Sequence, residues 1–264
     1  MNPILNQQLK QIELQEQKIL SQSEHTILDS TLTPVLDKLQ DKIPAKLVDT
    51  LNNAFYKSFQ LVFKKGSTYI EKTYNKDRIE LEYDINNYAL DKRMNKRHIN
   101  RLDRHSKQSQ LINSSFSVVE GSVLGILGIG LPDTLLLLSV MVKTIYEIAL
   151  SYGYSYDKEE EKAYLLLLIN TAIAKGEQQK DLNKRLELLS ETLDHSIEAQ
   201  VDVDMQMKET SKALSEALLT AKFVQGIPIV GVVGGAVNYS IVNRVAKFAR
   251  IKYKKRYLLK KLTD

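Results

Sequence analysis

The segment GIGLPDTLLLL, residues 128–138, places the carboxylate of Asp133 between three helix-breaking residues, two glycines and a proline, and a run of four leucines. Pro132 lacks the backbone N–H that the first turn of a helix leaves unused, so we expect a helix to begin there. Asp133 would then meet free backbone donors and the positive end of the helix dipole. This position favours a capping role, while a pocket in which Asp133 holds a small-molecule ligand stays open as the alternative.

A second apolar segment, residues 223–243, carries no charged residue and repeats the same pattern at Gly226, Ile227 and Pro228. Glycine can close a helix in the left-handed conformation, and the proline two residues later starts the next helix. Small residues spaced four apart, such as Gly231 and Gly235, let helix backbones approach closely. We therefore expect both glycine-rich segments to pack together at the centre of the fold.

Neither apolar segment predicts a comfortable membrane span, which needs about 20 mostly apolar residues. The first segment is interrupted at Pro132, and only fifteen residues follow Pro228 before the charge at Arg244. Insertion of a hairpin partway into a bilayer remains an alternative to packing in a protein core.

Motifs for catalysis and for metal or cofactor binding are not apparent. The chain has no cysteine, and its four histidines are scattered. It contains no phosphate-binding loop, no complete dinucleotide fingerprint and none of the usual hydrolase or zinc-protease motifs. We predict no metal and no cofactor, and the sequence favours a non-enzymatic protein without settling the question.

The net charge of +5 is concentrated near the C-terminus, where residues 244–264 hold nine Lys or Arg and one Asp. A basic stretch directly after an uncharged segment is typical of a contact with anionic lipid or with a membrane partner. The residues predicted to make this contact are Arg244, Lys247, Arg250, Lys252, Lys254, Lys255 and Arg256. A second basic stretch, residues 91–107, is interpreted as a solvated helix face.

Helical spacing of apolar residues predicts an all-α fold. Residues 1–30 are expected to form an amphipathic helix that packs loosely, and residues 31–264 to form one helical domain. Further helices are predicted from Pro44, over residues 77–107, and from a capping pair at Asp157 and Glu160 up to Gly176. Residues 178–224 predict one very long helix or two, whose leucine stripe could also support a scaffold or an oligomer.

The segment GLPDTLLLLSVMVKTIYEIALSYGYSYDKEEEKAYLLLLI and the later IPIVGVVGGAVNYSIVNRVAKFARIKYKKRYL resemble the EcsC family of bacterial proteins. The similarity extends from about Pro34 to Leu262. It implies a mainly helical protein and supplies no catalytic residues. The positions that match the family motif, and that would line a candidate pocket, are Gly130, Pro132, Asp133, Tyr152, Gly153, Tyr154, Pro228, Gly231, Asn238 and Tyr239.

The family is named for a gene that lies beside those of an ABC transporter, which implies an auxiliary or regulatory role near membrane transport. With the basic tail, the resemblance favours a cytoplasmic protein, peripheral at the inner face of the membrane, that contacts anionic lipid or a membrane transporter. Nucleic acid is a less favoured partner. A small-molecule binder or enzyme at Asp133, and a helical scaffold, are the two alternatives.

Overall fold

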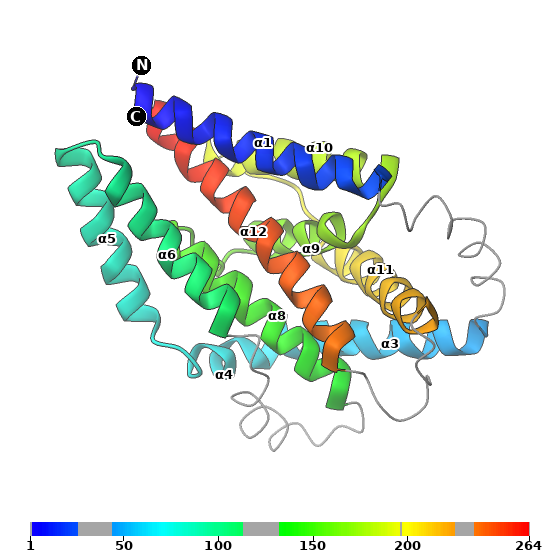
Figure 1. Ribbon diagram of the computed structural model, residues 1–264. Helices are drawn as coiled ribbons and strands as arrows, with labels where there is room; N and C mark the ends of the chain where they lie inside the picture. The colour runs from blue at the N-terminus through cyan, green and yellow to red at the C-terminus, as the bar shows by residue number, and fades with distance from the viewer. Residues whose placement is uncertain (1, 26–43, 113–131, 196, 225–234, 264) are drawn as a thin grey trace.

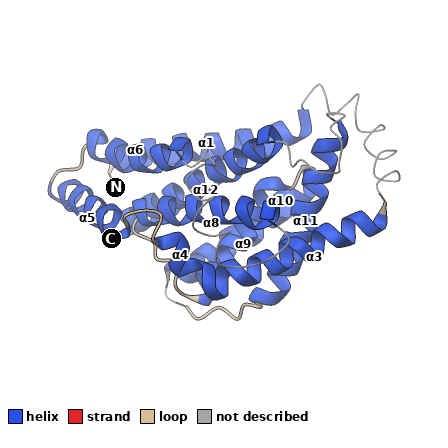
Figure 2. Cartoon of the chain, turned by 90° about the horizontal axis from the view of Figure 1, so that it is seen from below, coloured by secondary structure: helices blue, strands red, loops and turns tan. Residues whose placement is uncertain are grey.

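The computed structural model describes residues 2–25, 44–112, 132–195, 197–224 and 235–263, and every regular element within them is a helix (Figures 1 and 2). This confirms the all-α prediction. The elements are α1 (Pro3–His25), α3 (Ala45–Leu61), a π-helical turn (Val62–Gly66), α4 (Ser67–Glu71), α5 (Lys76–Lys92), α6 (Lys96–Ile112), α8 (Pro132–Ser151), α9 (Glu159–Ile173), α10 (Gly176–Asp194), α11 (Val203–Val224) and α12 (Gly235–Thr263).

Helices α8 and α9 form the centre of the molecule. Helix α8 packs against α3, α5, α6 and α12, and α9 packs against α10, α11 and α12. Among the described residues one stretch, residues 134–151 of α8, is long and apolar enough to cross a bilayer, and 94% of it is buried inside the fold. This helix is therefore a core helix in the structure, as the packing interpretation of the first apolar segment predicted.

Helix α12 runs diagonally across the molecule and ends close to the N-terminus (Figure 1). It contacts α1, α6, α8, α9, α10 and α11. At 29 residues it is about 44 Å long, which lets a single helix hold together elements from both ends of the chain. The glycine-rich segment before it lies outside the described residues up to residue 234.

The first helix packs more firmly than its sequence predicted. Leu5 and Ile12 are buried, while Leu9 and Ile19 pack against the edge of the core. Helix α1 lies along α12 and α10 and places its apolar stripe between them. The predicted amphipathic face is confirmed, and the expected loose packing is not what the structure shows.

Several predicted helix boundaries need correction. Residues 77–107 form two helices separated at Arg93, not one. Helix α9 begins at Glu159 without a side-chain cap, and Asp157 instead accepts a hydrogen bond from Ser155, so the predicted capping pair is wrong. Gly176 starts α10 with φ of +57° and does not end the helix before it. Residues 178–224 form two helices, α10 and α11, which was one of the two alternatives.

The end of α8 directs the chain back across the core. Gly153 adopts φ of +79°, a left-handed conformation that closes a helix and that glycine enters without steric cost. The backbone N–H of Tyr154 donates to the carbonyl of Ala149 at 3.0 Å. A Cβ at Gly153 would overlap the Tyr83 ring, so a residue without a side chain is also required here by the space available. The turn brings Tyr154 and Tyr156 into the core, where both side chains are buried.

Candidate functional site: a buried ionic core and an exposed basic helix

Half of the residues predicted to form the Asp133 pocket lie outside the described structure or have undescribed side chains. Gly130, Pro228 and Gly231 are among the residues that the structure does not describe. Pro132 and Asp133 are the first two residues of α8, which confirms the predicted helix start. Their side chains are not described, so capping and ligand binding both stay predictions for Asp133.

The remaining motif residues divide between two ends of the molecule. Tyr152, Gly153 and Tyr154 follow the C-terminal end of α8, about 30 Å along the 20-residue helix from its start. Asn238 and Tyr239 lie in the first turns of α12, and Figure 1 shows α8 and α12 beginning at the same end. The motif residues therefore do not line one common pocket.

Tyr152 anchors the end of α8 to α6. Its hydroxyl donates to Asp103 Oδ1 at 2.7 Å and lies 3.1 Å from Ser106 Oγ. Burial, and after it the nearby charge of Asp103, raises the pKa of Tyr152 well above its ordinary value. The phenol therefore stays neutral and serves as a hydrogen-bond donor, which is a structural role in this setting.

Arg256 of α12 is held by two carboxylates and clamped between aromatic rings. Its guanidinium donates to Asp194 on α10, with a shortest distance of 2.7 Å, and to both oxygens of Glu161 on α9, at 2.9 and 3.1 Å. The guanidinium carbon lies 4.2 Å from the Tyr154 ring centre and 4.5 Å from that of Tyr164. Although burial acts to lower the pKa of Arg256, its hydrogen bonds raise it well above the ordinary value.

A second group of charges joins α1 to α12. Lys252, which is almost fully buried, donates to Glu16 of α1, and Lys255 donates to the other Glu16 oxygen at 2.8 Å and to Glu187 of α10. Burial alone would raise the pKa of Glu16, but the two ammonium groups together lower it below its ordinary value of 4.5. Burial lowers the pKa of Lys252, a shift that Glu16 and Glu187 only partly offset.

Lys254 completes the buried ionic core by reaching α6. Its ammonium group donates to Asp103 Oδ2 at 2.7 Å and to the Gln8 side chain of α1 at 3.1 Å. Asp103 thus binds both Lys254 and Tyr152 inside the fold. We name these groups the buried ionic core; its members are Lys252, Lys254, Lys255, Arg256, Glu16, Asp103, Glu161, Glu187 and Asp194.

The predicted basic membrane face of α12 requires correction, because Lys252, Lys254 and Arg256 are buried and ion-paired. Four cations of the buried ionic core face five carboxylates, so the core presents no positive excess. Of the other predicted residues, Arg244 donates to the carbonyl of Ala174 and Arg250 is half-buried. Lys247 is the exposed member of the predicted set.

The exposed positive surface lies instead on α6, on the turn that precedes it and on Lys92, the last residue of α5. The seven basic residues in this stretch are all exposed: Lys92, Arg93, Lys96, Arg97, Arg101, Arg104 and Lys107. The sole acidic residue in the same stretch is Asp103, which is turned inward to Lys254. Arg97, Arg101 and Arg104 follow one another at four and three residues, so they share the outer face of the helix. No described carboxylate forms an ion pair with the basic residues of α6. We call these seven residues the α6 basic face.

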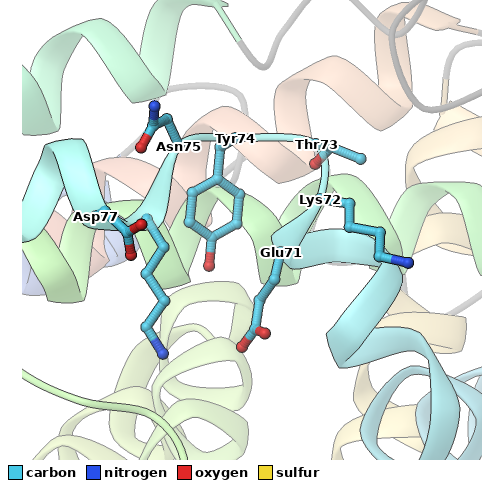
Figure 3. A pocket seen from close by; sticks show the side chains of 7 residues that line it. Glu71, Lys72, Thr73, Tyr74, Asn75 and Asp77 are labelled. Atoms are coloured by element: carbon cyan, nitrogen blue, oxygen red, sulfur yellow. The ribbon is translucent and has the colours of Figure 1, made fainter.

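A surface hollow of about 510 Å³ lies at the turn between α4 and α5 (Figure 3). The hydroxyls of Tyr74 and Tyr156 are 2.5 Å apart beside it, and the Tyr156 ring stacks on Tyr146 with ring centres 3.6 Å apart. Burial raises the pKa of Tyr74 above its ordinary value, which keeps the phenol protonated. The residues that line the hollow are Glu71, Lys72, Thr73, Tyr74, Asn75, Lys76 and Asp77. Mixed charges on one turn do not select a ligand class.

Sequence reasoning missed the carboxylates of the buried ionic core. One signal was present for Glu16, which lies four residues after Ile12 on the apolar stripe of α1. A charged residue inside an apolar stripe indicates a buried ion pair, since an unpaired charge there would be very costly. Its partner 236 residues later could not be inferred from spacing. Within the described chain, no group of three His, Cys, Asp or Glu residues could hold a metal ion.

Comparison with known families gives one match: the sequence model of the EcsC protein family matches residues 6–258. The match begins inside α1, so the similarity reaches further towards the N-terminus than the resemblance that began near Pro34. No curated protein and no solved structure matches the chain.

Replacing Arg256 by Met should destabilise the fold by about 3 kcal/mol, because the partly buried Asp194 and Glu161 would lose their shared, buried cation. The matched change, Arg185→Met, removes an exposed arginine from α10 and should shift the free energy of unfolding by no more than about 0.5 kcal/mol. Urea denaturation followed by circular dichroism measures both. Equal, small losses for the two variants would show that the ionic core contributes little.

Replacing Glu16 by Gln should remove a contribution to stability that depends on pH. Because the pKa of Glu16 is lower in the folded chain than its ordinary value of 4.5, its charge stabilises the fold fully above about pH 4.5. This contribution is lost as the pH falls through the lower folded value. The difference in free energy of unfolding between wild type and Glu16→Gln, measured with urea from pH 7 to pH 3, should shrink below pH 4.5. A difference that is constant over this range would contradict the ion pair.

Proposed function

The chain belongs to the EcsC protein family, and from this premise we propose that it is a non-enzymatic peripheral membrane protein that docks on anionic lipid through the α6 basic face. The single observation that carries the proposal is the exposure of seven basic side chains on one short stretch whose only acid is turned into the core. The proposal keeps the predicted type of partner and moves the contact from α12 to α6.

The chemistry of the α6 basic face fits a charged plane. Its arginines and lysines have long stems that reach out from a 17-residue helix, which is about 25 Å long. Each basic residue near an anionic bilayer contributes about 1 kcal/mol of attraction. Several such residues on a rigid helix act together, since the fold has already fixed their positions.

An auxiliary role beside a membrane transporter follows as part of the same proposal. Docking by surface charge would keep the protein at the membrane without a spanning helix, where it could meet a transporter laterally. The packing of the apolar stretch of α8 inside the core supports a peripheral protein over a spanning one. A scaffold built through the leucine stripe of α10 is less favoured, since Leu182 and Leu186 are buried within the chain.

The proposal is tested by flotation with vesicles that contain phosphatidylglycerol, compared with vesicles of phosphatidylcholine alone. Wild type should float with the anionic vesicles at low salt and should be released as the ionic strength rises, because salt screens exposed charges. The variant Arg97→Glu, Arg101→Glu, Arg104→Glu should lose flotation.

A matched control makes the same charge change on another face, with Lys184→Glu, Arg185→Glu and Lys212→Glu on exposed positions of α10 and α11. This control should float like wild type. Flotation of the α6 variant at the wild-type level would overturn the proposal. Binding of wild type to DNA but not to anionic vesicles would also overturn it and would assign the basic face to nucleic acid.

A further inference from the structure

Helix α5 exposes an apolar stripe beside the α6 basic face. Leu81, Ile85 and Tyr88 are 58%, 58% and 64% exposed, although apolar side chains of this size are usually covered. Their spacing of four and three residues places them on one face of the helix. Lys92 continues the stripe by a further turn, and its ammonium group lies 5.3 Å from the centre of the Tyr88 ring.

The position of the stripe follows from the contacts on the rest of α5. Asn87 accepts a hydrogen bond from Tyr257 of α12 at 2.9 Å, and Asp91 pairs with Lys261 of α12 at 2.7 Å. These contacts fix the flank of α5 that faces α12. The apolar stripe lies on the side of α5 opposite its buried residues Ile79 and Leu90, and α5 and α6 pack as an antiparallel hairpin at one end of the molecule (Figures 1 and 2).

Exposed acidic residues of α5 border the stripe along one edge. Asp84 lies three residues after Leu81 and four before Tyr88, and Asp91 lies three residues after Tyr88, so both are neighbours of the stripe on the helix surface. Asp77, which is also exposed, lies four residues before Leu81. The cations that accompany the stripe are therefore Lys92, at its end, and the basic residues of the neighbouring helix α6.

We propose that Leu81, Ile85 and Tyr88 insert into the headgroup region of an anionic bilayer while the α6 basic face binds the lipid phosphates. This inference rests on the proposed function and deepens it, since it adds an apolar contact and fixes the orientation of the molecule on the membrane. Helices with an apolar stripe beside basic residues bind in the interface in this way. Tyrosine is favoured at this depth because it combines an apolar ring with a polar hydroxyl.

Two features favour lipid over a protein partner on this stripe. A stable dimer interface buries about 1,200–2,000 Å² in total, far more than three side chains on one helix can offer. The neighbouring arginines and lysines of α6 are exposed and have no described carboxylate partner, so the α6 side of this surface complements an anionic plane. A bilayer supplies both the phosphates for these cations and an apolar layer for the stripe.

The absence of tryptophan from the chain allows a direct test. In the variant Tyr88→Trp, the single indole reports the polarity around the stripe. Its emission should shift to the blue when vesicles containing phosphatidylglycerol are added, and lipids brominated on the acyl chains should quench it. The matched control Met205→Trp places an indole at another exposed apolar position, 55% exposed on α11, and should show neither effect.

The two proposals fail in distinguishable ways. If Tyr88→Trp floats with anionic vesicles in a salt-sensitive manner but its emission does not change, insertion of the stripe is overturned while docking by α6 stands. A blue shift at position 205 but not at position 88 would also overturn the inference, since another face would then be in the bilayer. If wild type itself does not float, both proposals fail together.

Discussion

The fold depends on ion pairs between the buried cations of α12 and carboxylates on the helices around it. A lysine or arginine taken out of water costs several kcal/mol unless it is paired and hydrogen-bonded, and Lys252, Lys254 and Arg256 are all in this position. Their partners come from α1, α6, α9 and α10. Because the three cations pair with carboxylates on four helices, sliding α12 by one turn, about 5.4 Å, would break these pairs simultaneously. The charges therefore specify how the helices are arranged around the apolar centre.

This use of the C-terminal charges decides which surface of the molecule is positive. By sequence, the basic residues after position 243 look like the natural contact for a membrane, since most of the net charge is found there. In the folded chain, carboxylates of the core offset the basic cluster at residues 252–256, while the basic residues of α6 keep their charge exposed. The same reasoning about anionic surfaces then applies to α6, whose basic stretch was interpreted from the sequence alone as a solvated helix face.

Local features of the fold were predictable because they depend on neighbours in the sequence. The helix predicted from Pro44 is present as α3, and Phe55, Phe59 and Val62, which have the spacing of one helix face, are buried in and after it. The start of α8 at Pro132 followed from the backbone preferences of proline. The family resemblance was also carried by such local segments, and it reaches most of the chain.

The site could not be predicted to the same extent, because its contacts join residues far apart in the chain. Nothing near Lys252 indicates that Glu16 will neutralise it, and Asp103 looked like one more residue of a charged helix. The exposed stripe of α5 was equally hidden: Leu81, Ile85 and Tyr88 have the spacing of a buried face. Only the packing of α5 against α6 and α8, with its side-chain contacts to α12, shows that these residues are left outside.

The distribution of charge between core and surface can be measured directly by labelling lysines with an amine-reactive ester and reading each site by mass spectrometry. Lys92, Lys96 and Lys107 are exposed, whereas Lys252 and Lys254 are buried. We predict rapid labelling of the first three in the free protein, protection of these three by anionic vesicles, and slow labelling of Lys252 and Lys254 in both conditions. Rapid labelling of Lys252 and Lys254, with vesicles protecting α12 and not α6, would contradict both the buried ionic core and the proposed membrane contact.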